Sequence, residues 1–355
     1  MTMNNVLQRS PHEAIPVFLA ADERYAPYAA IMMRSVLLNT RSRIDFYIMA
    51  NGIRPETQAK VVATCAPFPH ARLEFIDMGA SELRQFQSMR HLTVETYSRY
   101  FIAELKPEIS KAVYVDVDII ARGDIADLYA QPLDGHPLGV VPTDASERWP
   151  RQLMALWPDY RGKRYFNAGV LVMDVAWFRR NDATRRLVQL THAMKDVLMC
   201  ADQDALNVFF QEDLQLLDAR FNYNTKERLE EPSAPPPVLL HFANQFKPWN
   251  SFTDAYSKYF RTVAKETVFW EDIHPVIASG ILSAQEASIP RGILLQCSPL
   301  AVLLLRLRLA RFLVETCIKR ESKKSHYVKK ANAVRNVIRA YKEYTRDASW
   351  GRAMS

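Results

Sequence analysis

The segment KAVYVDVDII, residues 111–120, is an apolar, β-rich run that contains two aspartates. Asp116 and Asp118 follow the strand-like residues 113–115, and alternation along an extended chain places residues i and i+2 on the same side. Two carboxylates held together repel each other and are costly to bury, and a divalent cation resolves both problems. Their oxygen atoms suit Mg²⁺ or Mn²⁺, which can also bridge to the phosphates of a nucleotide. Because such a pair arises about once by chance in a chain of this composition, the spacing alone does not establish a metal site.

The sequence on the amino-terminal side of this motif alternates between strand-like and helix-like patterns. The expected strands are IPVFLAA (15–21), IDFYIMA (44–50) and LEFID (73–77), and the expected helices are ERYAPYAAIMMRSVLLNT (23–40), RPETQAKVVATC (54–65) and TYSRYFIAEL (96–105). This rhythm predicts an α/β fold with a mostly parallel, Rossmann-like sheet and helices on both faces. Such a sheet binds ligands beyond the carboxyl ends of its strands. The chain has only 10 glycines and neither GxGxxG nor a P-loop, which disfavours a dehydrogenase or a P-loop enzyme.

The composition is that of an ordinary folded protein, with 48% hydrophobic and 24% charged residues in a chain of 355. Its four cysteines are far apart, which argues against a zinc module or a disulfide framework and fits a reducing cytoplasm. We expect neither a signal peptide nor a membrane span, because we find no cleavage site and no apolar stretch of about 18 residues. Beyond residue 275 the composition changes to Leu, Arg and Lys, so we expect a domain over residues 1–275 and a tail over residues 276–355.

The tail is strongly basic. Residues 291–355 hold 15 Lys and Arg but 4 Asp and Glu, a local charge of +11 in a chain of net charge +7. Arg308, Arg311 and Lys319 recur at helical spacing among leucines, and a basic amphipathic helix of this kind lies on anionic membrane surfaces. The alternative is a helix packed on the domain with a solvated basic face. Nucleic acid is not an expected partner, because the tail has few aromatics and no recognition module.

Six segments in order resemble glycosyltransferase family 8, the retaining enzymes of GT-A fold that include bacterial lipopolysaccharide galactosyl- and glucosyltransferases and glycogenin. The segments are VFLAADERYAPYAAIMMRSVLLNT (17–40), HLTVETYSRYFIAEL (91–105), VYVDVDIIARGDIADLY (113–129), YFNAGVLVMDVAWFR (165–179), ADQDALNVFF (201–210) and LLHFANQFKPW (239–249). Together they span roughly residues 15–250, about two-thirds of the chain. The resemblance therefore implies a GT-A glycosyltransferase domain, followed by the basic helical tail.

The resemblance also assigns roles to individual residues. It implies Mn²⁺, or Mg²⁺, held by Asp116, Asp118 and His241, and a UDP-hexose donor whose diphosphate meets Lys247. The other donor-binding residues that it implies are Ala20, Ala21, Asp22, His91, Arg99, Val117, Asn167, Asp202, Gln203 and Asn244. The residue types alone leave plainer alternatives open. These alternatives are a core histidine at 241, a helix cap at Asp22, an N-cap formed by Asp202-Gln203-Asp204, a surface salt bridge at Arg99 and a loop histidine at 91.

The resemblance also implies that Asp144, Asp202 and Gln203 surround the transferred hexose as catalytic residues, and carboxylates and amides can pair with sugar hydroxyls. The side-chain amide of Gln203 is a poor nucleophile, which argues against a covalent intermediate. We therefore favour attack of the acceptor hydroxyl on the anomeric carbon from the face that UDP leaves, with the departing phosphate oxygen taking the acceptor proton. Two departures from the family pattern, Arg24 and Asn244, leave the sugar identity open between glucose and galactose.

The acceptor implied by the resemblance is a glycan or glycolipid, the lipopolysaccharide core, reached at the inner face of the cytoplasmic membrane. Three alternatives stay open at this point. The first is a self- or protein-glycosylating enzyme like glycogenin, the second is a metal-dependent nucleotidyltransferase, and the third is a catalytically silent binding protein.

Overall fold

The structure is a computed structural model of the chain. It describes residues 14–79, 97–143, 148–157, 160–162, 164–195, 198–225, 235–243, 247–249, 256–275 and 277. Two compact units are present, the first of residues Met1–Glu227 and Glu231–Ala243, the second of Arg228–Glu230 and Asn244–Ser355. The basic tail lies outside the described residues except for Ile277, so the boundary at residue 275 stays a prediction.

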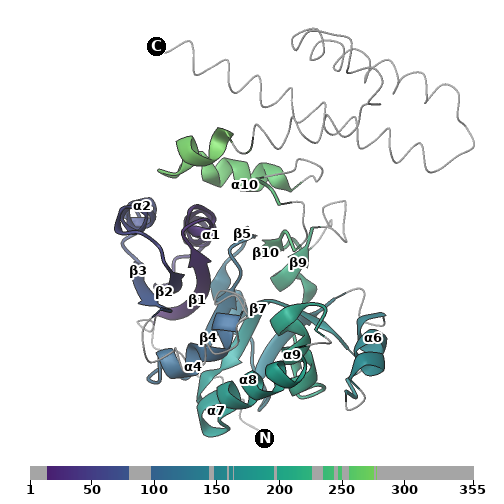
Figure 1. Cartoon of the computed structure of the whole chain (residues 1–355). Coiled ribbons are helices and arrows are strands. Elements are labelled where there is room, and N and C mark those ends of the chain that lie inside the picture. Colours follow the sequence, from purple (N-terminus) through teal and green to yellow (C-terminus); the bar gives the residue numbers. More distant parts are fainter. Residues whose placement is uncertain are drawn as a thin grey trace, which may run out of the picture. The chain divides into compact units, whose positions relative to one another are not determined.

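A seven-stranded sheet forms the centre of the first unit (Figure 1). Its strands, in spatial order, are β3 (Ala71–Asp77), β2 (Ile44–Asn51), β1 (Ile15–Asp22), β4 (Lys111–Val115), β7 (Phe166–Asp174), β6 (Leu138–Pro142) and β8 (Gln215–Leu216). β1 runs parallel to β2 and β4, and β2 runs parallel to β3. β7 is antiparallel to both β4 and β6. The predicted mostly parallel α/β sheet is therefore confirmed, with one reversed strand that the sequence patterns did not indicate.

A second sheet, of three strands, begins with the strand that comes next after β4 along the chain. It consists of β5 (Ile119–Ala121), β10 (Leu239–His241) and β9 (Tyr223–Asn224), with β10 in the middle. The predicted end of the strand at Val115 is confirmed, and the remainder of the β-rich run belongs to the other sheet, which the chain enters at Ile119. The intervening residues, 116–118, are the ones that carry the two aspartates.

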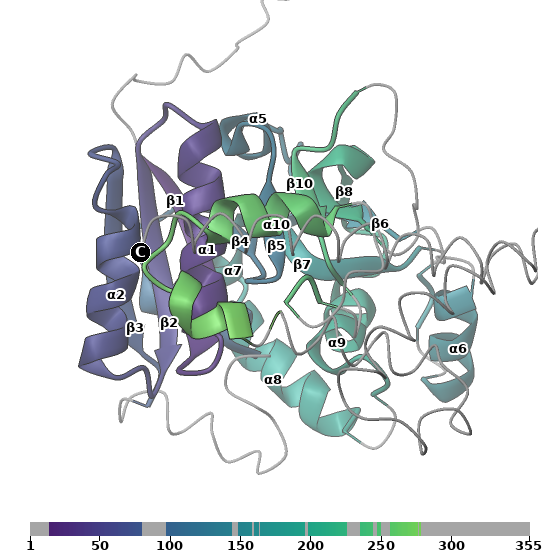
Figure 2. The ribbon, with the colours of Figure 1, turned by 90° about the horizontal axis from the view of Figure 1, so that it is seen from above.

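Helices cover both faces of the large sheet (Figure 1), as the sequence predicts. α1 (Ala26–Asn39) and α2 (Pro55–Cys65) lie side by side on one face (Figure 2). The other face carries η2 (Ser98–Phe101), α4 (Ile102–Leu105), α7 (Val175–Arg180), α8 (Ala183–Ala193) and α9 (Ala201–Phe210). Val17, Phe18 and Leu19 of β1 are all fully buried, as expected for a strand covered on both sides.

The remaining elements are short. In the first unit they are α5 (Ile125–Tyr129), α6 (Arg148–Leu156) and η3 (Ala219–Asn222), and in the second unit α10 (Ser257–Ala264). In the second unit the Trp249 ring packs on Phe260 of α10, with centroids 5.6 Å apart. Among the described residues, no helix has both the length and the apolar character needed to cross a membrane.

Candidate active site

The two aspartates of the first motif are fixed by backbone hydrogen bonds to different sheets. The Asp116 N–H donates to the Gly169 carbonyl at 2.8 Å, which extends the ladder between β4 and β7. The Asp118 carbonyl accepts from the Phe242 N–H at 3.0 Å, directly after β10. The turn between the sheets therefore has its backbone held at both ends, and its side chains are presented from a rigid frame.

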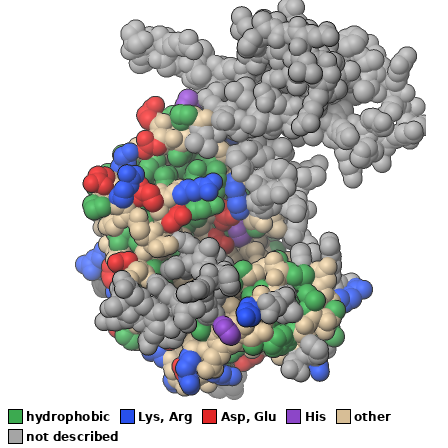
Figure 3. All heavy atoms as spheres, in the orientation of Figure 1, with side chains coloured by type: hydrophobic (Ala, Val, Ile, Leu, Met, Phe, Trp, Pro, Cys, Tyr) green, Lys and Arg blue, Asp and Glu red, His purple; other side chains and the backbone are tan. Residues whose placement is uncertain are grey.

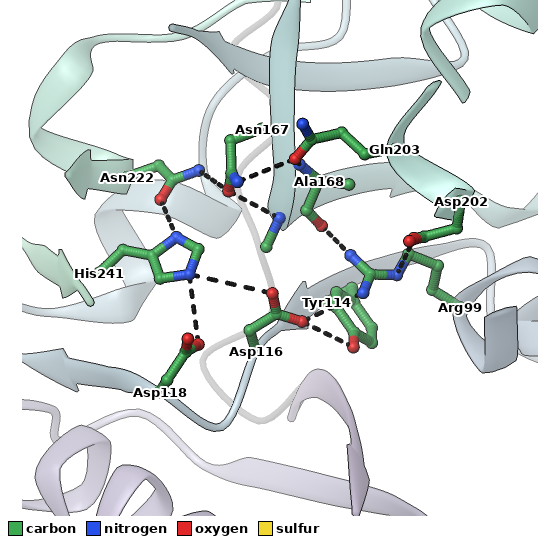
Figure 4. Close-up of polar contacts among 11 residues, drawn as sticks. Arg99, Tyr114, Asp116, Asp118, Asn167, Ala168, Asp202, Gln203, Asn222 and His241 are labelled. Carbon is green, nitrogen blue, oxygen red and sulfur yellow. Dashed lines mark hydrogen bonds and ion pairs between the residues drawn. The ribbon is translucent and has the colours of Figure 1, made fainter. Parts of the chain in front are cut away.

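His241 reaches this turn through strand pairing. β10 is antiparallel to β5, and His241 lies opposite Ile119 in the register. Its Nε2 atom is 3.2 Å from Asp118 Oδ1 and 3.9 Å from Asp116 Oδ2 (Figure 4). The ligand atoms of the three residues all lie within 4.8 Å of one another. The structure thus brings together the three predicted metal ligands, although Asp118 and His241 are 123 positions apart in the sequence.

Gly169 keeps the space between these side chains open. A Cβ atom at this position would overlap His241 Cε1 and would lie 2.7 Å from Asp116 Oδ2. Two carboxylates and an imidazole are a donor set that suits a divalent ion such as Mn²⁺ or Mg²⁺. The residues present therefore fit the implied ion, and any side chain at residue 169 would fill the cradle that they form. On the face of the molecule that Figure 3 shows, acidic side chains and a histidine lie next to one another near the middle.

Arg99 is buried behind the carboxylates, so the alternative of a weak surface salt bridge is wrong. Its guanidinium Nη2 is 3.2 Å from Asp116 Oδ1, and its Nη1 donates to the Ala168 carbonyl. Its Nε lies 2.9 Å from Asp202 Oδ2 as an ion pair, outside the alignment of a linear hydrogen bond. The guanidinium also lies over the Tyr114 ring, with 4.3 Å to the centroid. One arginine therefore joins the β4–β5 turn to the start of α9.

Charge and burial shift the pKa values in this group. Burial, the largest single effect, disfavours the charged form of Arg99, but Asp202, Tyr114 and Asp116 together outweigh it and raise the pKa of the guanidinium. Burial raises the pKa of Asp202 to about 6, although Arg99 acts in the opposite direction. The Asp202 carboxyl therefore titrates closer to neutral pH than an ordinary aspartate does.

The other polar residues at the start of α9 are held by the protein. Gln203 Oε1 accepts from the Asn167 side chain at 2.9 Å and from the Ala168 N–H at 3.1 Å. Asp204 Oδ2 accepts from the N–H groups of Met199 and Cys200 at 2.6 and 2.8 Å. Asp204, not Asp202, thus satisfies the backbone donors that precede this helix.

The carboxyl end of β1 lies at the same edge of the sheet as the β4–β5 turn, because β1 and β4 are parallel with Phe18 opposite Tyr114. Ala20, Ala21 and Asp22 are at this end, in agreement with a donor-binding edge. Asp22 Oδ1 also accepts from the Tyr25 N–H at 2.8 Å in the turn before α1, but the N-cap of that helix is Tyr25 and not Asp22. Val117 lies in the turn itself.

Four predicted donor or catalytic positions are not placed relative to this site. His91, Asp144 and Asn244 lie outside the described residues, and Lys247 belongs to the second unit. Conversely, sequence reasoning missed Tyr114, Asn222 and Gly169. Tyr114 could have been predicted, because alternation along the strand places it on the same side as Asp116. The Tyr114 hydroxyl donates a hydrogen bond to Asp116 Oδ1 at 2.9 Å. Asn222 sits in a 3₁₀ turn and had no such signal.

Comparison with known proteins identifies the family. A model described as glycosyl transferase family 8 matches residues 16–253. The chain is 27% identical over 245 residues to glycosyltransferase GlyF of Streptococcus pneumoniae, which covers 67% of this chain and 58% of that protein. It is 23% identical over 269 residues to lipopolysaccharide 1,3-galactosyltransferase of Salmonella typhimurium, which covers 72% and 79% respectively.

A solved structure shows the same fold. Galactosyltransferase LgtC, in complex with donor and acceptor sugar analogs, has a TM-score of 0.62 at 24% identity, over 72% of this chain and 96% of that chain. The predicted GT-A architecture is therefore confirmed. This chain spans little more than half the length of GlyF. The family model covers two-thirds of the sequence, which shows that the chain belongs to glycosyl transferase family 8.

Proposed function

We propose that this chain transfers a hexose, glucose or galactose, from a UDP-sugar to a glycan or glycolipid acceptor with retention of the anomeric configuration. The observation that carries the proposal is the convergence of Asp116, Asp118 and His241 within 4.8 Å, at the carboxyl edge of the parallel strands. This edge is where open α/β sheets bind their ligands. Family membership gives the reaction class, and the site supplies the chemistry for it.

The three ligands would hold Mn²⁺ or Mg²⁺, which supplies charge neutralisation at the diphosphate of the leaving UDP. Arg99 keeps Asp116 in place from behind, and it neutralises part of the charge of the carboxylates. Asp202 and Gln203 would orient the hexose over this edge. Among the described residues, the Asp202 carboxylate is buried against Arg99, and the Gln203 amide is a poor nucleophile, so we favour attack from the face that UDP leaves. The departing phosphate oxygen would then take the acceptor proton.

We also propose an acceptor of the lipopolysaccharide core type at the inner face of the cytoplasmic membrane. The relative from Salmonella is a lipopolysaccharide galactosyltransferase, which supports this acceptor. The basic charge of residues 291–355 supports attachment to an anionic membrane surface, where such a glycolipid resides.

The full chain, incubated with Mn²⁺ and a panel of UDP-sugars, tests the proposal. We expect slow release of UDP from UDP-glucose or UDP-galactose, and α-linked product once an acceptor is added, as measured by NMR. Release of pyrophosphate would show a nucleotidyltransferase, and a tyrosine-linked hexose in the intact mass would show the glycogenin-like alternative. No release of UDP from any donor with Mn²⁺ or Mg²⁺ would contradict the proposal.

A further inference from the structure

A continuous chain of side-chain hydrogen bonds leads from His241 into the protein, and Figure 4 shows its links as far as Gln203. We name it the amide relay. Its links are His241 Nδ1 to Asn222 Oδ1 at 2.8 Å, Asn222 Nδ2 to Asn167 Oδ1 at 3.1 Å, Asn167 Nδ2 to Gln203 Oε1 at 2.9 Å, Gln203 Nε2 to the Tyr165 hydroxyl at 2.8 Å, and that hydroxyl to Asp204 Oδ1 at 2.6 Å. The amide relay thus connects the proposed metal ligand on β10 to the start of α9.

Two backbone groups of β7 fix the direction of the amide relay. The Gly169 N–H donates to Asn167 Oδ1 at 3.0 Å, and the Ala168 N–H donates to Gln203 Oε1 at 3.1 Å. A backbone N–H only donates, so neither side-chain amide can be turned over without setting a donor against a donor. The oxygen of Asn167 therefore faces Asn222, which must present its NH₂ group there and its oxygen to His241.

The far end of the amide relay agrees with this direction. Burial, reinforced by the Asp204 carboxylate, raises the pKa of Tyr165, so its hydroxyl stays protonated. That hydroxyl donates a hydrogen bond to Asp204. Asp204 accepts on both oxygens, since two backbone N–H groups donate to the second one. Every link thus points from the imidazole toward the buried carboxylate.

We infer that Asn222 is a positioning residue that holds neutral His241 in the tautomer with the proton on Nδ1, so that Nε2 faces Asp116 and Asp118 as a lone-pair donor. Without this constraint, Asp118 Oδ1 at 3.2 Å from Nε2 would favour the opposite tautomer, which cannot coordinate a cation through that atom. Hydrogen-bond partners of metal-bound imidazoles act in this way elsewhere. The consequence for metal binding rests on the proposed function, whereas the tautomer does not.

The tautomer can be read directly in the metal-free full chain by ¹⁵N NMR of the histidine side chains. The spectrum would be recorded at about pH 9, well above the ordinary imidazole pKa of about 6.5. The His241→Gln spectrum assigns the resonance. We expect a pyrrole-type Nδ1 and a pyridine-type Nε2 in the wild-type protein, and the reverse in Asn222→Ala. Asn222→Leu, which fills the same volume, replaces Asn222→Ala if the latter does not fold.

Asn207→Ala is the matched control. Asn207 is a buried amide that bonds the Phe166 N–H and carbonyl and the Gln203 carbonyl, without touching the imidazole. Its replacement should lower the melting temperature at least as much as Asn222→Ala and leave the His241 tautomer unchanged. A purely structural role for Asn222 predicts that both variants lose stability and that neither changes the tautomer.

The affinity for Mn²⁺, measured from the electron paramagnetic resonance signal of the free ion, gives the second readout. We expect Asn222→Ala to weaken binding about 10–100-fold. Asn222→Asp keeps the acceptor for Nδ1–H but cannot donate to Asn167. We therefore expect Mn²⁺ affinity within about 3-fold of wild type, combined with a lower kcat because the amide relay to Gln203 is broken.

The outcomes separate the two proposals. A wild-type protein with the proton on Nε2, or an Asn222→Ala variant that keeps it on Nδ1, overturns the inference whatever the metal data show. If the tautomer responds as expected and the wild-type protein binds no divalent ion, the proposed function fails and the positioning role of Asn222 stands.

Discussion

The chain contains two Asp-X-Asp sequences, Asp116-Val117-Asp118 and Asp202-Gln203-Asp204, and the structure uses them in opposite ways. The first follows a strand, its side chains are 28% and 13% exposed, and both turn toward His241. The second opens a helix, where residues i and i+2 are about 200° apart around the axis. Asp202 therefore faces Arg99, whereas Asp204 faces Tyr165.

The difference lies in what satisfies the negative charges. Asp202 and Asp204 are 5% and 0% exposed, and both are paired with protein groups. At the first pair, Arg99 and Tyr114 both meet Asp116 Oδ1, while Asp116 Oδ2 and Asp118 Oδ1 converge on the imidazole. Identical spacing thus gives a candidate ligand site after a strand and an internal anchor at a helix start. Each prediction below tests one side of this contrast.

Asp118→Asn should have the largest effect on activity. It keeps the shape of the side chain and removes one of two acidic ligands, so we expect UDP release to fall at least about 1,000-fold and Mn²⁺ binding to be lost. The melting temperature should stay the same or rise, because a repulsive carboxylate is removed. Turnover and calorimetric unfolding measure both effects. Near-wild-type turnover with Mn²⁺ in excess would remove the first pair from the chemistry.

Gly169→Ala tests the space between the ligands. The added methyl group would overlap the His241 ring and crowd Asp116 Oδ2, so the imidazole has to move. We expect Mn²⁺ affinity to fall about 10–100-fold, as for other changes that misorient a ligand. Gly139→Ala in the adjacent strand β6 is the control, because the atoms nearest to its Cβ would be those of Leu133, Leu217 and Val172, which are not ligands. Equal Mn²⁺ affinity in Gly169→Ala and wild type would show that the ligands do not need this cradle.

Part of the fold and of the candidate site could be predicted from the sequence, and part could not. The parallel sheet, its flanking helices and the three candidate ligands followed from apolar periodicity and from the resemblance. The split of residues 111–120 between two sheets did not, because β-propensity is equally high before and after the turn. The antiparallel entry of β7 also depends on tertiary pairing with β4 and β6.

The connections between the two aspartate pairs were the least predictable feature. Arg99 and Asp202 are about a hundred positions apart, and Asn222 meets His241 across two short strands, so neither contact has a periodic signal. Ala201 adopts a left-handed backbone with φ of 48°, which non-glycine residues seldom do. Asp204 holds this irregular helix start through Met199 and Cys200, a role that composition cannot reveal.

Asp204→Asn should reverse the pattern of Asp118→Asn. The amide has one acceptor oxygen in place of two, so either Tyr165 or the two backbone N–H groups before α9 lose their partner. We expect the free energy of unfolding to fall by about 2 kcal/mol, with Mn²⁺ affinity within about 3-fold of wild type. Urea denaturation and Mn²⁺ titration of the same preparation measure both. Loss of Mn²⁺ binding without loss of stability would place Asp204 among the ligands and erase the contrast.

The pH dependence of stability tests the environment of Asp202. Its pKa is raised from 3.8 to about 6, chiefly by burial, so the folded state binds a proton more tightly than the unfolded state. Between about pH 4 and pH 6 its contribution to the free energy of unfolding therefore decreases as pH rises, by at most about 1.4 kcal/mol per pH unit. In EDTA, urea denaturation of wild type and Asp202→Asn across this range should differ by that slope. Parallel curves would mean that Arg99 keeps Asp202 ionised throughout, as a fully compensated buried ion pair.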